Sequence, residues 1–492
     1  MTNANHSCPL FGRGLALIVV AVVYATGCGG GNPPVQSRGT GARLAAPSEL
    51  TAAQRAWGVG PKRSADVTYQ PEVVIIDEGP EAIRGMSANG IEWTIDAAAS
   101  GAGDLKPGRI LFATSRAVGR VLGVRRDGSN LAVTLGPVAL TEVVRDAVIT
   151  VDQPIDFTNA IEYTAPDLPG TSSAAAPLQA RAPIGSEASL RFVRATARDT
   201  VQAGFWRVSS TTLGDFQVTP AVSLSGIGAQ VTSDAAGLRF VGKTTLRLEQ
   251  PRLSFSLEIS KGTLRRCELR LIGAAGLLME LDAASERGSK GDAARTLHLP
   301  TDFSIPLLGE AVPFAVTLRQ SFVVKTRFGA PGALHARGDY AVTGGFDVGY
   351  RNGRLGVTGP AGFTANESLI DSINGVSMMP SGLLLTHQVR VIVGIGAFGF
   401  VTGPYFALTS AMGVSRHSDL DTLARCRGDV VNITVGAGVG YFMPRVITDG
   451  INTVLRALNL GEVANEGGIT LLEPTKLINQ SNITPKIKAC GA

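Results

Sequence analysis

Long stretches in which apolar and polar residues alternate constrain the fold of this 492-residue chain more than any other feature. Alternation places every second side chain on the same face of a β-strand, so that one face can pack in a core while the other meets solvent. The clearest examples are GLRFVGKTTLRLEQ, FAVTLRQSFVVKTRF and DVVNITVGAGVGYF. Because these segments exceed an ordinary strand, the sequence predicts a mainly β protein with few helices, built as a large antiparallel β-sandwich or barrel-like body.

The chain divides into regions of different composition. Residues 66–163 contain short Val, Ile and Leu runs separated by Gly, Pro, Asn and Asp, which predicts a small β domain. Residues 164–189 lose periodicity and fill with Pro, Ala and Ser, as expected of a linker. The long alternating segments follow, so residues 190–492 are predicted to form the large β-rich domain.

Two local patterns are more specific. Alternating runs from Val118 to Leu135 meet at Asp127-Gly128, which predicts a hairpin because glycine supplies the positive φ of a tight turn. Late in the chain, a stripe of apolar residues from Ile447 to Leu458 has helical spacing and predicts one helix.

The first residues have the pattern of an export signal. The apolar run GLALIVVAVVY (residues 14–24) is too short for a membrane-spanning helix, which needs about 20 residues, and is followed by Ala25-Thr26-Gly27-Cys28. This arrangement resembles the lipobox of bacterial lipoproteins. The resemblance implies that residues 1–27 are a signal peptide and that Cys28 is acylated and becomes the new N-terminus.

The residues after Cys28 indicate how the anchored protein is displayed. Residues 28–65 begin with a Gly-, Pro- and Ser-rich stretch, which predicts a flexible tether. The resemblance to lipoproteins also implies a location in the cell envelope. Gly29 stands where an acidic residue would favour retention in the inner membrane, so the outer membrane is expected if the organism is Gram-negative.

The small β domain has a resemblance of its own. It rests on Lys106-Pro107-Gly108 before the strand RILFA, Gly119, the turn Asp127-Gly128, the strand LAVTLG and an acidic segment near Glu142. These features are similar to those of a β module found in large secreted bacterial proteins of unassigned function. The resemblance implies an extracytoplasmic β architecture and no particular activity.

Charge and cysteine content exclude some classes of partner. A net charge of +5 spread over the whole chain gives no reason to expect nucleic-acid binding. Beyond Cys28, the cysteines permit one disulfide and one buried thiol, with the pairing left open, and their spacing does not predict a zinc site. They are Cys267, Cys426 and Cys490.

The segment VIVGIGAFGF contains the spacing of a dinucleotide-binding loop at Gly394, Gly396 and Gly399. That loop requires a helix directly afterwards, because the helix N-terminus holds the pyrophosphate. Here Phe400-Val401-Thr402 favours a strand and Gly403-Pro404 would interrupt a first helical turn. We therefore interpret these glycines, like those of TVGAGVGYF, as small residues that permit strand curvature or close approach of another layer.

No group of residues predicts catalysis, a cofactor or a metal. The acidic pairs Asp77-Glu78 and Asp419-x-Asp421 have too few ligands for a calcium loop and are interpreted as turn residues. The histidines of the mature chain form no helical pair, and a Gly-x-Ser-x-Gly elbow is absent from the sequence. These histidines are His298, His335, His387 and His417.

Arg-Gly-Asp occurs at residues 337–339 and 427–429 and resembles the integrin-binding motif of animal matrix proteins. A Gly-rich β chain also places these residue types at hairpin corners, so we interpret both copies as turns; adhesion through them is the alternative and would require an animal host.

Three functions remain open. The first is a noncatalytic envelope lipoprotein with a structural, adhesive or binding role, attached to the membrane through its N-terminal lipid. The second is a carrier of a lipid or other apolar ligand, and the third is an envelope enzyme with an unrecognised site. The expected partners are an envelope protein, a glycan or an apolar ligand. A filled core favours the first function, an apolar cavity the second, and a cleft with converging acids or histidines the third.

Overall fold

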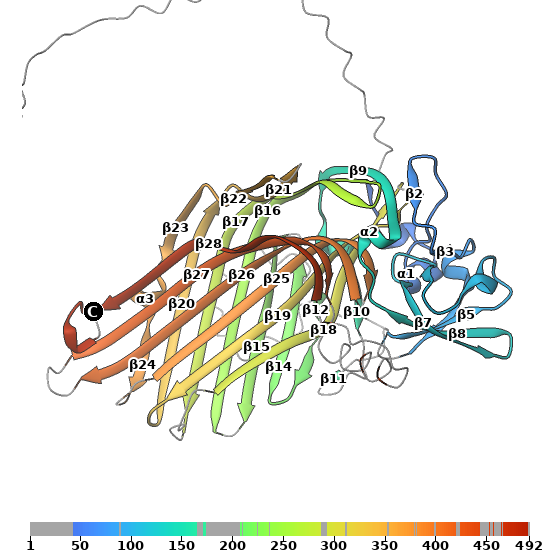
Figure 1. Cartoon of the computed structure of the whole chain (residues 1–492). Helices are drawn as coiled ribbons and strands as arrows, with labels where there is room; N and C mark the ends of the chain where they lie inside the picture. Colours follow the sequence, from blue (N-terminus) through green and yellow to red (C-terminus); the bar gives the residue numbers. More distant parts are fainter. Residues whose placement is uncertain are drawn as a thin grey trace, which may run out of the picture. The chain divides into compact units, whose positions relative to one another are not determined.

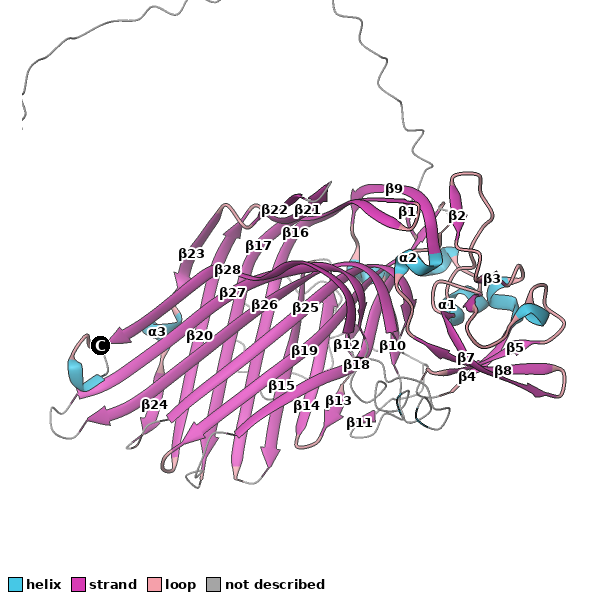
Figure 2. Ribbon diagram, viewed as in Figure 1, coloured by secondary structure: helices cyan, strands magenta, loops and turns pink. Residues whose placement is uncertain are grey.

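The structure is a computed structural model of the chain. It describes residues 43–87, 90–164, 171–173, 207–208, 210–223, 225–235, 237–286, 293–309, 312–351, 354–377, 379, 381–397, 400–419, 424–442, 452, 456, 464 and 466–490. Strands predominate throughout these residues (Figure 2), which confirms the mainly β fold class.

Two large antiparallel sheets form the body of the protein (Figure 1). The first sheet follows the order β11-β13-β14-β15-β16-β17-β20-β23, with β2, β9, β12, β21, β22 and β24 attached to it. Its main strands are β11 Thr171–Ser173, β13 Thr211–Leu213, β14 Phe216–Ser223, β15 Gly226–Ala235, β16 Leu238–Ser260, β17 Thr263–Ser285, β20 Gly332–Thr343 and β23 Gly362–Glu367. The attached strands are β2 Val67–Tyr69, β9 Val144–Pro154, β12 Arg207–Val208, β21 Gly345–Arg351, β22 Arg354–Thr358 and β24 Asn374–Ser377.

The second sheet follows the order β1-β18-β19-β25-β26-β27-β28, with β10 also paired to β18. Its strands are β1 Arg43–Leu44, β10 Ile161–Thr164, β18 Ala293–Leu308, β19 Ala315–Phe328, β25 Ser381–Ala397, β26 Phe400–Asp419, β27 Ala424–Phe442 and β28 Glu466–Thr484. Strands β1 and β10 contribute to this sheet early in the chain. After β11 to β17 have built most of the first sheet, β18 and β19 belong to the second, β20 to β24 to the first, and β25 to β28 complete the second. The short helix α3, Leu369–Ser372, precedes β24.

The inner faces of the two sheets share one hydrophobic core. This core includes Phe255 and Met279 from the first sheet and Phe322 and Val391 from the second, all at most 2% exposed. At Gly242, a Cβ atom would lie 2.9 Å from Leu385 Cδ2 of the opposite sheet, so the layers are in close contact there. The alternation in the sequence has its expected consequence, because one face of each long strand is buried against the other sheet.

A smaller six-stranded sheet occupies the preceding part of the chain, in the order β3-β6-β7-β8-β5-β4. The predicted hairpin is confirmed: β7 and β8 pair from Asp127 and Asn130 outward, and Gly128 has φ +59°. The short helices are α1 Ala52–Trp57 and α2 Leu140–Val143. The strands are β3 Val73–Ile75, β4 Ile83–Met86, β5 Glu92–Asp96, β6 Ile110–Phe112, β7 Val118–Asp127 and β8 Asn130–Gly136.

The predicted separation of residues 66–163 from the large domain needs correction. Strand β9 pairs with β16, and β10 pairs with β18, so the end of the predicted small domain belongs to the large sheets. These strands supply hydrogen-bonding edges that composition cannot reveal, because a strand's partner is not encoded in its own pattern. Most of the predicted linker, 164–189, lies outside the described residues; within it, β11 pairs with β13.

The tether predicted for residues 28–65 is also too long. Residues 28–42 lie outside the described part of the chain, but β1 pairs with β18 and α1 follows it. Ala45, Leu50 and Val59 are buried in a small cluster of their own. A few apolar residues spaced through a Gly- and Ala-rich segment were enough to fix it against the body.

The late helix predicted from Ile447 to Leu458 falls almost wholly outside the described residues. Among the described residues, no helix has the length and apolar character required to cross a membrane.

The glycine segment that resembles a dinucleotide loop lies in strands, as we interpreted it. Gly394 of β25 and Gly403 of β26 face each other across the pair, where a Cβ atom on Gly403 would lie 2.7 Å from Gly394 Cα. Gly396 has φ +101°, and its N–H donates to the carbonyl oxygen of Ser115 at 2.5 Å. The glycines therefore allow two backbones to approach and join the small sheet to β25; Gly399 is outside the described residues.

Candidate functional site

The outward face of the second sheet carries polar side chains in register. On β25, Val389, Val391 and Val393 point into the core, so Gln388 and Arg390 project from the opposite face. Directly paired residues on neighbouring strands project from the same face. Each outward residue of β25 therefore begins a row that continues across β26 and β27.

The row that begins at Arg390 contains a gap in side-chain volume. Arg390 pairs with Ala407 of β26, which pairs with Gly436 of β27. Both partners are small, so space remains above the sheet beside the arginine. From the sequence we interpreted the glycines of TVGAGVGYF, which include Gly436, as positions that permit strand curvature or close approach of another layer. In the structure Gly436 lies in the floor of a hollow.

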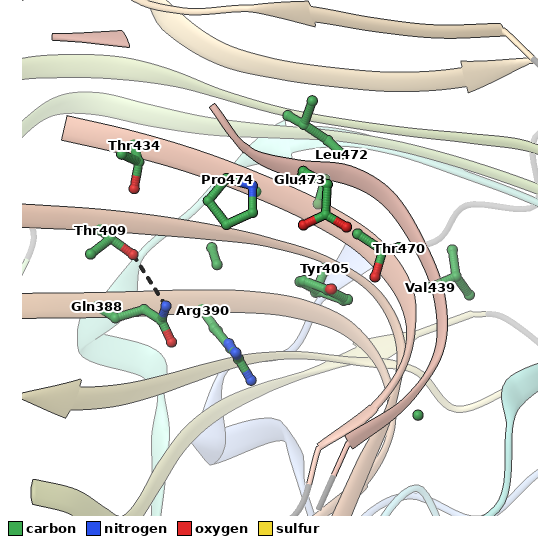
Figure 3. Close-up of a pocket in the computed structure, with 14 residues that line it drawn as sticks. Gln388, Arg390, Tyr405, Thr409, Thr434, Val439, Thr470, Leu472, Glu473 and Pro474 are labelled. Atoms are coloured by element: carbon green, nitrogen blue, oxygen red, sulfur yellow. Dashed lines mark hydrogen bonds between the residues drawn. The ribbon is translucent and has the colours of Figure 1, made fainter. Parts of the chain in front are cut away.

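The neighbouring rows supply the walls. On one side, Gln388 pairs with Thr409, which pairs with Thr434, and Gln388 Nε2 donates to Thr409 Oγ1 at 3.1 Å. On the other side is Tyr405, which lies two residues before Ala407 on β26 and on the same face of the sheet. The guanidinium carbon of Arg390 is 5.9 Å from the centroid of the Tyr405 ring. Figure 3 shows these residues around the hollow.

The edge strand β28 closes the remaining side. Its pairing with β27 shifts register between Ile433 and Gly438, so extra residues of β28 are accommodated by bulges. Leu472, Glu473 and Pro474 lie in this irregular stretch and line the hollow (Figure 3). A proline is tolerated there because an edge strand at a bulge does not require every N–H.

The hollow has a volume of about 360 Å³, within the range of small-ligand sites of roughly 300–1,000 Å³. Arg390 and Glu473 are the charged residues among those described in its lining, and they have opposite sign. Amide and hydroxyl groups supply most of the other polar atoms. These residues can form hydrogen bonds to a polar molecule.

A buried ion pair lies beside Arg390 in the same row. Arg319 of β19 pairs with Arg390 in register, and its guanidinium binds Asp302 of β18 through two bonds of 2.8 Å and 2.5 Å. The side chains of Arg319 and Asp302 are 11% and 3% exposed. The buried guanidinium of Arg116 also interacts electrostatically with Asp302, so this carboxylate serves two cations.

The predicted cysteine chemistry can be placed in part. Cys426 and Cys490 form a disulfide with Cα atoms 5.4 Å apart, which is one of the pairings that the sequence left open. Cys267 is a buried free thiol, and burial raises its pKa to about 12. Such a thiol is a poor nucleophile and metal ligand. Cys28, the predicted lipidation site, lies outside the described residues.

Both Arg-Gly-Asp sequences lie within strands, not at hairpin corners as we interpreted them. Residues 337–339 belong to β20, where Asp339 forms an ion pair with Arg247. Residues 427–429 belong to β27, where Asp429 is 6% exposed and accepts hydrogen bonds from the backbone and side chain of Asn482. A Cβ atom on Gly338 would lie 2.6 Å from Tyr340 Cε2, and one on Gly428 would lie 2.7 Å from Ser415 Oγ. Both glycines therefore leave room for a neighbouring side chain of the sheet, a role that turn propensity does not reveal.

The histidines do not converge. His387 lies in the core, 2.8 Å from Gln320 Oε1 and stacked on Phe322 with centroids 4.6 Å apart. His335 is hydrogen-bonded to Asp282 on the outward face of the first sheet. The described residues contain no group of three His, Cys, Asp or Glu side chains able to hold a metal ion.

The acidic pairs are bonded as turn residues where they are described. Asp77 binds Arg63, and both carboxylate oxygens of Glu78 accept from the N–H of Ser100 at 3.0 Å. The side chain of Asp419 and all of Asp421 lie outside what the structure describes.

Fold and hollow together define an antiparallel β-sandwich protein with a polar cavity on the outside of one sheet. The chain belongs to the family described as Domain of unknown function (DUF8402), whose model matches residues 200–471. Residues 53–146 match a second family, Domain of unknown function (DUF8403), which corresponds to α1 and the small sheet. No curated protein and no solved structure matches the chain.

Sequence reasoning did not identify the lining residues as a site. Gln388, Arg390, Thr409 and Thr434 come from separate strands and form no contiguous motif. The available signal was the alternation itself, which assigns these positions to the polar face of their strands. Only the pairing register brings them together.

Proposed function

We propose that this protein is a noncatalytic, lipid-anchored protein of the cell envelope whose sandwich body binds a polar ligand or partner on its outer surface. The observation that supports a binding role is the hollow between Arg390, Gln388 and Glu473, which is lined by hydrogen-bonding groups together with apolar residues such as Val439 and Leu472. The lipobox-like sequence before Cys28 supports the anchor, and Gly29 supports the outer membrane if the organism is Gram-negative.

The alternative of an apolar carrier receives less support. A carrier requires an apolar chamber, whereas the space between the sheets is occupied by side chains from both, including Phe255, Phe314 and Phe322. Phe255 and Phe314 pack edge to face with centroids 6.4 Å apart. A lipid placed in the polar hollow would cover amide and hydroxyl groups without bonding them, which costs free energy.

Anchoring is tested by labelling cells with a fatty-acid analogue. We expect the wild-type protein to take up label and to fractionate with membranes. Cys28→Ser should abolish labelling and leave a precursor that retains the signal peptide, because acylation precedes cleavage in proteins with a lipobox. Cys267→Ser is the matched control, since that thiol is buried. Label that persists in Cys28→Ser would refute the lipoprotein proposal.

A further inference from the structure

We infer that the hollow on the second sheet binds a neutral saccharide unit, with Gln388, Arg390, Thr434 and Glu473 as the hydrogen-bonding groups. This inference rests on the proposed binding role and specifies the class of ligand. It follows from the balance of donors, acceptors and charge around the cavity.

The distribution of donors and acceptors favours hydroxyl groups. The guanidinium of Arg390 only donates hydrogen bonds, the carboxylate of Glu473 only accepts them, and Gln388 and Thr434 can do both. A sugar hydroxyl donates one hydrogen bond and accepts others, so a ring of hydroxyls can complement donors and acceptors alike. An apolar ligand could form no hydrogen bond with any of them.

The charges disfavour ionic ligands. An anion near Arg390 would also face Glu473, and a cation near Glu473 would also face Arg390. A neutral ligand with many hydroxyls avoids both conflicts.

The shape of the hollow suits a compact ring. Its floor is formed by Ala407 and Gly436, whose small size leaves the cavity above the sheet. Tyr405 also lines this space, with its ring packed partly against Ile392 and Val401. In Figure 3, Tyr405 is drawn near Glu473 and Thr470, and Gln388 lies on the other side of the view.

The test applies the full-length protein, purified in detergent, to an array of neutral, carboxylated and phosphorylated saccharides. The affinity for each saccharide that binds is then measured by isothermal titration calorimetry. We expect binding to neutral saccharides. Gln388→Leu and Thr434→Val should each weaken that binding about tenfold, because a ligand hydroxyl would lose its partner. Gly436→Ala should also weaken it, since the new methyl group enters the cavity.

Two controls distinguish a direct loss of ligand binding from a loss of folding in these variants. A Cβ atom on Gly436 would meet only ordinary contacts, the nearest being Leu472 O at 3.5 Å, so this variant should melt like the wild type. Thr232→Val on the outward face of the first sheet is the matched control for Thr434→Val and should leave binding unchanged.

The inference is overturned if no saccharide binds, if only charged saccharides bind, or if binding persists at full strength in Gln388→Leu, Thr434→Val and Gly436→Ala. Each of these results leaves the labelling of Cys28 unaffected. Failure of the saccharide inference is therefore distinguishable from failure of the lipoprotein proposal.

Discussion

The buried imidazole of His387 makes the stability of the body depend on pH. The side chain is 3% exposed, and burial lowers its pKa from 6.5 to about 3. In the unfolded chain the histidine binds a proton near pH 6.5, whereas in the folded protein it stays neutral down to about pH 3. Between these values the unfolded state binds more protons, so stability is lost as the pH falls.

The expected magnitude follows from this difference in pKa. Each pH unit below 6.5 removes about 1.4 kcal/mol of the free energy of unfolding, until the folded protein also begins to bind the proton. At pH 4.5 the loss attributable to His387 is therefore about 2.7 kcal/mol. This is a substantial part of the roughly 5–15 kcal/mol by which proteins are usually stable.

The assay is denaturant unfolding of the full-length protein in detergent at pH 7, 5.5 and 4.5. Because carboxylates titrate in the same range, the informative quantity is the difference in pH slope between wild type and a variant that lacks the histidine. His387→Leu combined with Gln320→Leu removes both members of the polar pair. Its stability should fall less steeply with acidification, by about 1.4 kcal/mol per pH unit.

His335 provides a control of opposite sign. Its hydrogen bond to Asp282 raises its pKa above 6.5, so its stabilising contribution is present below that value and is lost as the pH rises through the folded pKa. Removing His335 should therefore change the pH slope in the direction opposite to removal of His387. Parallel slopes for wild type and the His387→Leu, Gln320→Leu variant would refute the buried, neutral imidazole.

The remaining predictions concern packing, the buried ion pair and the free thiol. Gly394→Ala should lower stability by at least about 1–3 kcal/mol, because its Cβ would overlap the backbone of β26, whereas Gly436→Ala should change the melting temperature little; equal effects would contradict the close approach at Gly394. Arg319→Met should cost about 3–5 kcal/mol in chemical denaturation, because the buried carboxylate of Asp302 loses both hydrogen bonds from this guanidinium. Adding Asp302→Leu should restore much of the loss, and no recovery would argue against the pair. Cys267 should react with a thiol reagent only after unfolding, since burial raises its pKa to about 12; rapid reaction of the folded protein would contradict its burial.

The fold class could be predicted because the alternation of apolar and polar residues within a strand shows which of its two faces is buried. In β25, alternate residues such as Val389 and Val391 are apolar, and that pattern alone assigns one face to a core. The hairpin at Gly128 was equally local, since its turn needs only a positive φ. Both features depend on interactions within one stretch of chain.

Domain boundaries could not be predicted by the same reasoning. The end of β9 reads as one more short strand of the small domain, yet its hydrogen-bonding edge is paired to β16, about one hundred residues later, with Asp152 opposite Ser254. Backbone N–H and C=O groups are identical in every strand, so alternation does not say which edges meet. The two family matches leave most of β9 between them, since one ends at residue 146 and the other begins at residue 200.

The candidate site depends on register to a greater degree than the fold does. A shift of one residue between β25 and β26 would place Gln388 opposite a side chain of the other face, and Ala407 would no longer lie beside Arg390. The core would oppose such a shift strongly, because it would also expose Phe406 and Leu408, which are 2% and 7% exposed. The apolar face therefore fixes the register, and the register assembles the polar hollow on the opposite face. A substitution in the core that loosened this pairing would impair ligand binding without touching the cavity.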